Sequence, residues 1–118
     1  MGLMGGMMQI TPESMRVVYE MLAQLPPFKR LKLPPSEQVT FQAYNDPGCY
    51  GEYEPEHIIR ISKVKVGHLD TFIKTMAHEM VHLYLYVSRN KEWDKHTGKF
   101  AYYANRISLT MGFDPKEF

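Results

Sequence analysis

The chain contains 118 residues, of which 44% are hydrophobic and 23% are charged, so it is long enough for one core and too short for two ordinary domains. Its 14 basic and 13 acidic residues give a formal net charge of +1, which excludes the strongly basic balance on which charge-driven nucleic-acid binding depends. The single cysteine, Cys49, excludes an internal disulfide and a cysteine-rich zinc ribbon within this chain, and we interpret its thiol as structural.

The first ten residues, MGLMGGMMQI, are rich in methionine and glycine. We expect them to form a flexible tail, 1–10, ahead of one domain that spans residues 11–118. The tail lacks the basic start and the long apolar stretch of a signal peptide, and no run in the chain approaches the length of a transmembrane helix. These features predict a soluble, cytoplasmic protein with no membrane partner.

The N-terminal half of the chain predicts one helix and a small sheet. Thr11 and Pro12 are typical of a helix start, and the apolar spacing continues this helix to about Leu25. Three later segments have strand-like composition and are separated by turn residues, which predicts strands at residues 39–44, 49–53 and 58–62. The short connections between them favour a three-stranded antiparallel meander.

The C-terminal half of the chain predicts two helices. Apolar residues cover most of the circumference of residues 69–87, which is typical of a helix that is packed on several sides. Residues 98–111 have apolar side chains at helical spacing, so they predict a second helix packed against the first. Together these elements predict an α+β fold in which a small antiparallel sheet packs on the 69–87 helix, with flanking helices.

The most informative motif lies in the 69–87 helix. His78 and His82 are four residues apart and Glu79 follows the first histidine, as in the HExxH pattern of zinc hydrolases. Residues four apart share one face of a helix, so both imidazoles can bind one metal ion. Glu79 lies one step around the helix, where its carboxylate can act as general base toward a water molecule at the metal. Placing these polar groups in an apolar helix costs desolvation free energy, which indicates compensation by a metal or by hydrogen bonds.

A catalytic zinc ion usually has three protein ligands and a fourth position for water. His96 is the best candidate for the third ligand, because it follows a polar stretch that is long enough to turn the chain back toward the histidine pair. Glu92 and Asp94 are alternatives, since carboxylates also bind zinc. If either acid joined three histidines, no position would be left for water and the site would be structural.

The chain also resembles a known family. The run HEMVHLYLYVSRNKEWDKHTGKFAYYANRISLTMGF and the upstream run CYGEYEPEHIIRIS resemble the SprT-like zinc metallopeptidases, a family that includes the protease core of Spartan. The matching positions are His78, Glu79, His82, His96, Gly98, Phe100 and Gly112, and the resemblance covers about residues 38–113. It implies a zincin-like fold in which Zn²⁺ is held by His78, His82 and His96.

The activity implied by the resemblance is that of a zinc-dependent metallopeptidase acting on a protein or peptide. We expect Glu79 to take a proton from a zinc-activated water that attacks a peptide carbonyl, and then to return the proton to the leaving amine. Tyr50, Tyr53, Tyr102 and Tyr103 are candidates for stabilising the oxyanion. Association with DNA follows from the resemblance alone, and the net charge does not support it.

Two other functions stay open. The same site suits a metal-dependent hydrolase of a non-peptide amide or ester, and a non-catalytic binding module would keep zinc for its structure only. A free sheet edge that fits an extended peptide would favour the peptidase, whereas a deep closed pocket would favour a small substrate. His57 and His68 do not fit the metal-ligand spacing, and we interpret them as structural or surface residues.

Overall fold

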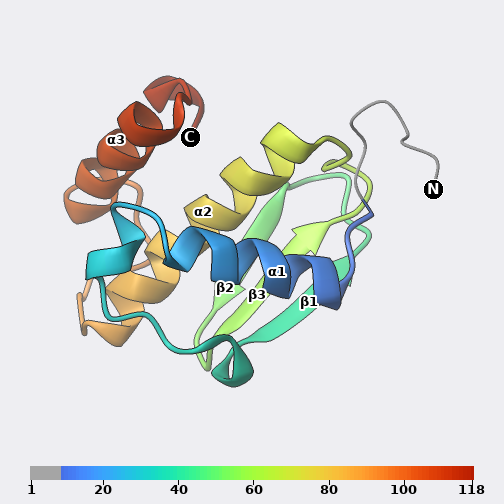
Figure 1. Ribbon diagram of the computed structural model, residues 1–118, viewed down its shortest axis with the longest axis horizontal. Coiled ribbons are helices and arrows are strands. Elements are labelled where there is room, and N and C mark those ends of the chain that lie inside the picture. Colours follow the sequence, from blue (N-terminus) through green and yellow to red (C-terminus); the bar gives the residue numbers. More distant parts are fainter. Residues whose placement is uncertain (1–8) are drawn as a thin grey trace.

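The computed structural model describes residues 9–118, so the predicted tail over residues 1–10 lies almost wholly outside the described residues. The described elements, in chain order, are α1 (Pro12–Ala23), β1 (Thr40–Tyr44), β2 (Gly51–Glu54), β3 (Ile58–Ser62), α2 (Leu69–Val87) and α3 (Lys99–Met111), with 3₁₀ turns at Phe28–Arg30, Ser36–Gln38 and Pro115–Glu117. Figure 1 shows their arrangement in space. The α+β class predicted from the sequence is confirmed.

The sheet differs from the predicted antiparallel meander. Its strand order is β1-β3-β2, so β3 lies in the centre. β2 and β3 are antiparallel, as predicted, but β1 runs parallel to β3 with Phe41 opposite Ile59. The sheet is therefore mixed, and the prediction of three antiparallel strands was wrong for β1.

The reason for this topology lies in segment 45–50, which the sequence predicts to be a tight turn between neighbouring strands. The segment crosses the end of β3 instead. The Ser62 N–H donates to the carbonyl oxygen of Tyr50 (2.8 Å), and Ser62 Oγ donates to the carbonyl oxygen of Asp46 (2.6 Å). Because these bonds hold the segment over the end of β3, β2 enters the sheet on the side of β3 opposite to β1.

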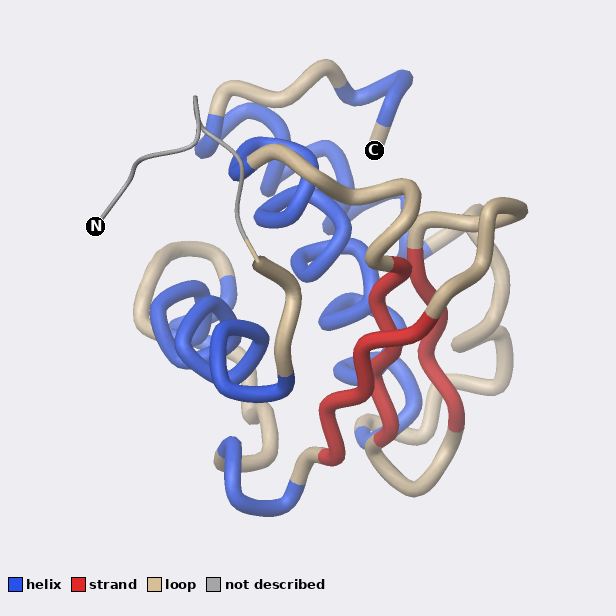
Figure 2. The backbone as a smooth tube through the Cα atoms, turned by 90° about the vertical axis from the view of Figure 1, so that its right-hand side faces the viewer, coloured by secondary structure: helices blue, strands red, loops and turns tan. Residues whose placement is uncertain are grey.

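The helices cover one face of the sheet (Figure 2). α1 packs against β1, α2 packs against β2 and β3, and the two helices contact each other, while α3 packs on α2. Core residues between these layers include Tyr19, Leu22, Phe41, Ile59, Phe72, Met76 and Met80, which are all buried. Each such side chain contributes roughly 1.5–3 kcal/mol on burial, so α2 is held firmly between the sheet and its neighbouring helices.

The opposite face of the sheet is polar. Arg60 in β3 forms ion pairs with Glu52 and Glu54 of β2, and its Nε donates to Oε1 of Gln42 in β1 (2.6 Å). The strand register aligns Gln42, Arg60 and Glu52 in one row across the sheet. Since successive side chains of a strand point to opposite faces, this row leaves the apolar side chains to face the helices.

The boundaries of α1 follow local signals. Thr11 caps the helix as predicted: its Oγ1 accepts a hydrogen bond from the Ser14 N–H, and Ser14 Oγ accepts one from the Thr11 N–H, both at 3.0 Å. The helix ends at Ala23, slightly before the predicted Leu25. Two prolines follow Leu25, and the residue before a proline is disfavoured in helical conformation, so the helix stops early.

The two later helices match the sequence prediction closely. α2 spans the predicted residues 69–87, and α3 covers the predicted 98–111 apart from its first residue. α2 is buried along most of its length from Phe72 to Leu85, which explains its nearly continuous apolar surface. No helix in residues 9–118 combines the length and the hydropathy that crossing a bilayer requires.

Candidate metal centre

The HExxH residues lie near the middle of α2. Glu79 and His82 are only 5% and 7% exposed, and His78 is half-buried. Glu79 points toward β2, because a Cβ placed on Gly51 would lie 3.4 Å from Glu79 Oε2. The packing of α2 in the core therefore fixes three polar side chains beside a strand at the edge of the sheet.

Segment 88–98 returns the chain toward the histidine pair, as predicted. Asn90 folds this segment: its backbone N–H donates to the carbonyl oxygen of Leu85 (2.9 Å), and its Oδ1 accepts from the Glu92 N–H (2.8 Å). These bonds cap the end of α2 and turn the chain back on itself. His96 reaches the histidine pair as a result.

An aromatic cluster, formed by Tyr53 of β2, Tyr86 of α2 and Trp93 of the returning segment, anchors this segment. The Trp93 ring packs edge-on against both tyrosines, with centroid separations of 5.7 Å to Tyr53 and 5.4 Å to Tyr86. Such edge-to-face pairs contribute about 0.5–1.5 kcal/mol each beyond the burial of their area. The segment is thus attached both to the sheet and to α2.

Phe100 lies against all three histidines. Gly98 has a φ of 60°, a backbone conformation that residues other than glycine rarely adopt, and it lets the chain turn sharply into α3. The Phe100 ring then stacks on His82 with centroids 4.6 Å apart, and contacts His78 and His96 at 4.8 and 4.9 Å. This buried ring gives the three imidazoles one apolar support.

Two backbone carbonyl groups orient the imidazoles of α2. Nδ1 of His82 lies 2.7 Å from the carbonyl oxygen of Trp93, and Nδ1 of His78 lies 2.7 Å from the carbonyl oxygen of Phe118. A carbonyl oxygen only accepts hydrogen bonds, so each Nδ1 carries the hydrogen. In a neutral imidazole the other nitrogen, Nε2, then keeps a free lone pair.

The three Nε2 atoms converge. Nε2 of His96 lies 3.2 Å from Nε2 of His78 and 3.2 Å from Nε2 of His82, and the three ligand nitrogens all lie within 4.8 Å of one another. A neutral His96 has at most one hydrogen on Nε2, so it cannot donate to both neighbours. Lone pairs are therefore left facing each other, and a cation between them would remove this repulsion.

The spacing fits a first-row metal ion. Two nitrogens at about 2.0–2.1 Å from a tetrahedral ion are separated by roughly 3.3 Å, which agrees with the 3.2 Å found here. His78, His82 and His96 could thus hold a metal ion. The fit rests on the donor atoms and on their orientation by the two carbonyl groups.

Neither acidic alternative belongs to this group. Within residues 9–118 the potential ligand atoms gather only around His78, His82 and His96, without Glu92 or Asp94. Asp94 lines a cavity beside the three histidines, and Glu92 is exposed. Among the described residues, the fourth side of the histidine group is therefore not closed by a carboxylate.

Burial has a large effect on the acid–base properties of Glu79. It raises the pKa of this carboxyl group from 4.5 to about 8, and the nearby Glu52 adds to the shift. In the absence of a cation the carboxyl group therefore holds its proton at neutral pH. A divalent cation at the histidine group would oppose this shift, because its positive charge favours the carboxylate.

The histidines of α2 are shifted in the direction that favours metal binding. Burial lowers the pKa of His78 from 6.5 to about 4, and the neighbouring His82 adds to this effect. Burial also lowers the pKa of His82, although the hydrogen bond to the carbonyl oxygen of Trp93 acts to raise it. Both imidazoles are therefore neutral at pH 7, which is the form that binds metal ions.

The four candidate tyrosines separate into two groups. Tyr50 lines a cavity with His78 and Glu79, and Tyr53 lines another with the three histidines. Tyr102 and Tyr103 lie on α3, where their rings pack against each other, and they line neither of these cavities.

The remaining histidines and the cysteine lie elsewhere. His68 is the exposed residue just before α2, and His57 lies in the turn between β2 and β3 with φ 63°. Cys49 Sγ lies 2.9 Å from the hydroxyl oxygen of Tyr44, in the loop that precedes β2. None of the three belongs to the histidine group.

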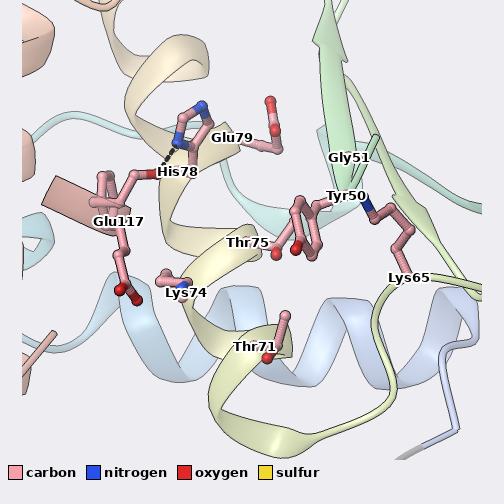
Figure 3. Close-up of a pocket in the computed structure, with 10 residues that line it drawn as sticks. Tyr50, Gly51, Lys65, Thr71, Lys74, Thr75, His78, Glu79 and Glu117 are labelled. Carbon is pink, nitrogen blue, oxygen red and sulfur yellow. Dashed lines mark hydrogen bonds between the residues drawn. The ribbon is translucent and has the colours of Figure 1, made fainter. Parts of the chain in front are cut away.

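Three cavities adjoin the histidine group, and Glu79 lines two of them. The first cavity, of about 580 Å³, is lined by His78 and Glu79 together with Tyr50, Gly51, Lys65, Thr71, Lys74, Thr75, Glu117 and Phe118. Figure 3 shows this cavity, with His78 on one side and Tyr50 on the other. The second cavity, of about 280 Å³, is lined by Glu79 and by all three histidines. The histidine group is accordingly accessible from outside.

Sequence reasoning missed the carbonyl groups of Trp93 and Phe118. A backbone oxygen has no signal in a sequence pattern, so no residue type could reveal them. It also missed the close approach of Gly51 to Glu79. Here a signal existed, since an isolated glycine within a strand pattern often marks a place where another group comes near the backbone.

The fold and the site together define a small α+β protein that carries a three-histidine group able to hold a metal ion beside a buried glutamate. The model of the SprT-like family matches residues 27–117. The chain therefore belongs to the SprT-like family, which suggests a metallopeptidase-type function. Neither a curated protein nor a solved structure gives a significant match to the chain.

Proposed function

We propose that the protein is a zinc-dependent metallopeptidase in which His78, His82 and His96 hold the zinc ion and Glu79 is the general base. The observation that carries this proposal is the convergence of three Nε2 atoms, at 3.2 Å from His96 to each partner, next to a buried carboxyl group. Membership of the SprT-like family supports it.

The donor set supports zinc in particular. Three neutral imidazoles are typical ligands of catalytic zinc, and they leave a fourth position for a water molecule. When bound, zinc supplies Lewis-acid chemistry that lowers the pKa of that water to about 7. The carbonyl groups of Trp93 and Phe118 keep His78 and His82 in the required tautomer and orientation.

Glu79 is the group that moves the proton. Its carboxylate takes a proton from the attacking water and delivers it to the leaving amine, as a general base and then a general acid. The buried position of Glu79 keeps bulk water from competing for that proton. Such a base contributes about 10²–10⁴-fold to the rate, so its loss should be decisive for activity.

An extended protein or peptide segment is the substrate that we propose. β2 is an edge strand and, through Gly51, lines the two cavities that also contain Glu79. A peptide that adds to the free edge of β2 would form main-chain hydrogen bonds and lie across Glu79. This arrangement also favours the peptidase over a hydrolase of small molecules, because the site is a cleft along a strand rather than a closed pocket.

The proposal can be tested by measuring metal content and proteolysis on the same proteins. We would compare the native chain with Glu79→Gln and His96→Ala, and include His68→Ala as a matched histidine control outside the site. Metal content is measured by mass spectrometry, and activity by cleavage of unfolded casein with and without added DNA. The DNA arm also tests the association that the family resemblance implies.

We expect one zinc ion per chain in the native, Glu79→Gln and His68→Ala proteins, and weaker binding in His96→Ala. Cleavage should occur in the native and His68→Ala proteins only. Equal zinc in all four proteins would remove His96 from the ligand set. Full zinc without cleavage in any condition would contradict the peptidase and leave a zinc-stabilised binding module or a hydrolase of another substrate.

A further inference from the structure

The two cavities that Glu79 lines differ in the charged side chains on their walls. The first cavity contains two lysines, Lys65 and Lys74, together with the hydroxyl groups of Thr71 and Thr75. Figure 3 shows Lys74 and Lys65 on opposite sides of this cavity, with the two threonines between them. Ammonium and hydroxyl groups donate hydrogen bonds, so this lining is suited to an anionic group.

The two lysines are available for a ligand. Within residues 9–118 the ion pairs all involve Arg60, so neither lysine has a carboxylate partner there. The ammonium group of Lys65 is held over the ring of Tyr50, 4.5 Å from its centroid, which keeps it at the wall of the cavity. Two acids, Glu79 and Glu117, also line this cavity. Because Glu79 is assigned to the reaction itself, Glu117 is the one acid in this lining that could compete with a ligand for the two lysines.

The second cavity has the opposite character. Asp94 lines it together with the aromatic rings of Tyr53 and Trp93, and its lining includes no lysine or arginine. Glu52 also lines it, but the carboxylate of Glu52 is paired with Arg60 on the opposite face of the sheet. Because Gly51 and Glu79 line both cavities, the two lie on either side of the proposed reaction centre. An extended peptide along β2 would place one side chain in each of them.

We propose that the cleft selects substrates by charge: the first cavity takes an acidic side chain through Lys65 and Lys74, and the second takes a basic side chain through Asp94. This inference rests on the proposed peptidase function, since the two cavities then bind residues on either side of the scissile bond. A preferred substrate has charges of opposite sign flanking that bond. The direction in which the peptide runs decides which charge comes first.

The test uses three unfolded peptides that differ only at the two flanking positions: aspartate before lysine, lysine before aspartate, and alanine at both. The kcat/KM of each is measured for the native chain, for Lys65→Met/Lys74→Met, and for Lys29→Met/Lys32→Met. The last double variant is a matched control, because Lys29 and Lys32 line neither cavity.

We expect the native chain and the control variant to cleave one charged order roughly two- to fivefold faster than the alanine peptide, and the reversed order more slowly. This ratio should approach one as salt screens the charges. In Lys65→Met/Lys74→Met the preference for the acidic side chain should be lost. Equal cleavage of all three peptides, or a lysine double variant that retains the full native preference, would overturn the inference.

Binding of the same peptides to Glu79→Gln, measured by fluorescence anisotropy, separates this inference from the proposed function. If the native chain cleaves no peptide, the peptidase proposal fails, while an order-dependent affinity that requires Lys65 and Lys74 would still support charge selection. If the affinities do not depend on the order of charges, the inference fails even where cleavage occurs.

Discussion

Nδ1 of His82 lies 2.7 Å from the backbone carbonyl oxygen of Trp93, and this bond ties the orientation of a candidate ligand to an aromatic cluster. Trp93 is held in place by edge-on contacts with Tyr53 and Tyr86. The position of the carbonyl oxygen therefore depends on a side chain that does not itself touch the metal position. The same segment leads on to His96, so the cluster positions two of the three imidazoles.

Replacing Trp93 with alanine should weaken metal binding. Without the indole ring, segment 88–98 loses its attachment to the sheet and to α2, and the carbonyl group no longer fixes the tautomer of His82. Changes in groups that orient ligands commonly cost about 10–100-fold in metal affinity, and we expect an effect of this size. Competition with a chromogenic chelator measures the affinity.

The matched control for this prediction is Trp93→Phe, which keeps an aromatic ring between Tyr53 and Tyr86. It should retain zinc affinity to within a few-fold of the native value. Equal affinity in Trp93→Ala and the native chain would show that the His82 orientation does not depend on the aromatic cluster.

The metal-free protein should lose stability as the pH rises from about 6.5 to 8. Burial raises the pKa of Glu79 to about 8 in the folded chain, against an ordinary value of 4.5. Between these values the folded chain holds a proton that the unfolded chain has released, so raising the pH favours unfolding. From pH 6.5 to 8 the loss should be about 2 kcal/mol, since one pKa unit corresponds to about 1.4 kcal/mol.

His78 acts in the opposite direction at lower pH. Its pKa of about 4 in the folded chain, against 6.5 ordinarily, means that the unfolded chain binds more protons between these values, so stability rises with pH there. The effects of His78 and Glu79 oppose each other below pH 6.5. Above pH 6.5 the effect of Glu79 should dominate, so the range from pH 6.5 to 8 reports the protonation of Glu79.

Urea unfolding in the presence of a chelator, at several pH values across this window, measures the effect. Glu79→Gln is the control, because an amide does not titrate and its stability should stay nearly constant from pH 6.5 to 8. A native chain whose stability rises or stays level over the same window would show that Glu79 is not protonated in the fold.

Much of the fold and of the candidate site could be predicted from local sequence signals. The bounds of α2 and β3 were predicted because both have strong apolar patterns bounded by turn residues. The gathering of His78, His82 and His96 was predicted because helical spacing fixes the first two and the length of the polar segment limits where the third can lie.

The parts that were not predicted depend on contacts between residues far apart in the chain. The parallel pairing of β1 with β3 depends on the hydrogen bonds from Ser62 to the carbonyl oxygens of Asp46 and Tyr50. No local sequence pattern encodes these bonds. The cavity with Lys65 and Lys74 likewise needs the loop after β3 and the first turns of α2 to lie side by side. Strand pairing and cavity charge are properties of the packed chain.

Replacing Thr11 with alanine should reduce stability without changing the metal centre. The change removes the acceptor for the Ser14 N–H at the start of α1, and loss of such a cap costs about 1 kcal/mol. α1 contacts α2 but supplies none of the three histidines, so zinc affinity should stay within twofold of the native value. Urea unfolding and chelator competition on the same samples measure both quantities.

Thr11→Ser is the control for this variant, because it keeps the hydroxyl acceptor and should restore most of the lost stability. If Thr11→Ala weakened zinc binding as strongly as Trp93→Ala, the metal centre would depend on the stability of the whole chain. The effect of Trp93→Ala could then no longer be attributed to the orientation of His82.

Replacing Gly51 with alanine should displace β2, the edge strand next to Glu79, and lower the stability of the fold. A Cβ at this position would lie 2.7 Å from the backbone oxygen of Arg60 and 3.0 Å from Cγ2 of Thr75. The first distance is too short to be relieved by a side-chain rotation, so β2 must shift away from β3 or from α2. Such overpacking costs about 1–3 kcal/mol, which urea unfolding would detect.

The activity of Gly51→Ala distinguishes the role of the edge strand from that of the metal centre. The histidines lie on α2 and on segment 88–98, and Tyr86 of α2 still packs against Trp93, so zinc affinity should fall less than in Trp93→Ala. Displacement of β2 beside Glu79 should reduce peptide cleavage more than tenfold if substrates add to this edge. Gly48→Ala is the matched control, since its Cβ would meet only a side-chain oxygen of Asp46 at 3.1 Å, which can move. Unchanged cleavage in a folded, zinc-loaded Gly51→Ala protein would contradict the use of β2 for substrate binding, because the strand cannot accept the added methyl group and keep its position.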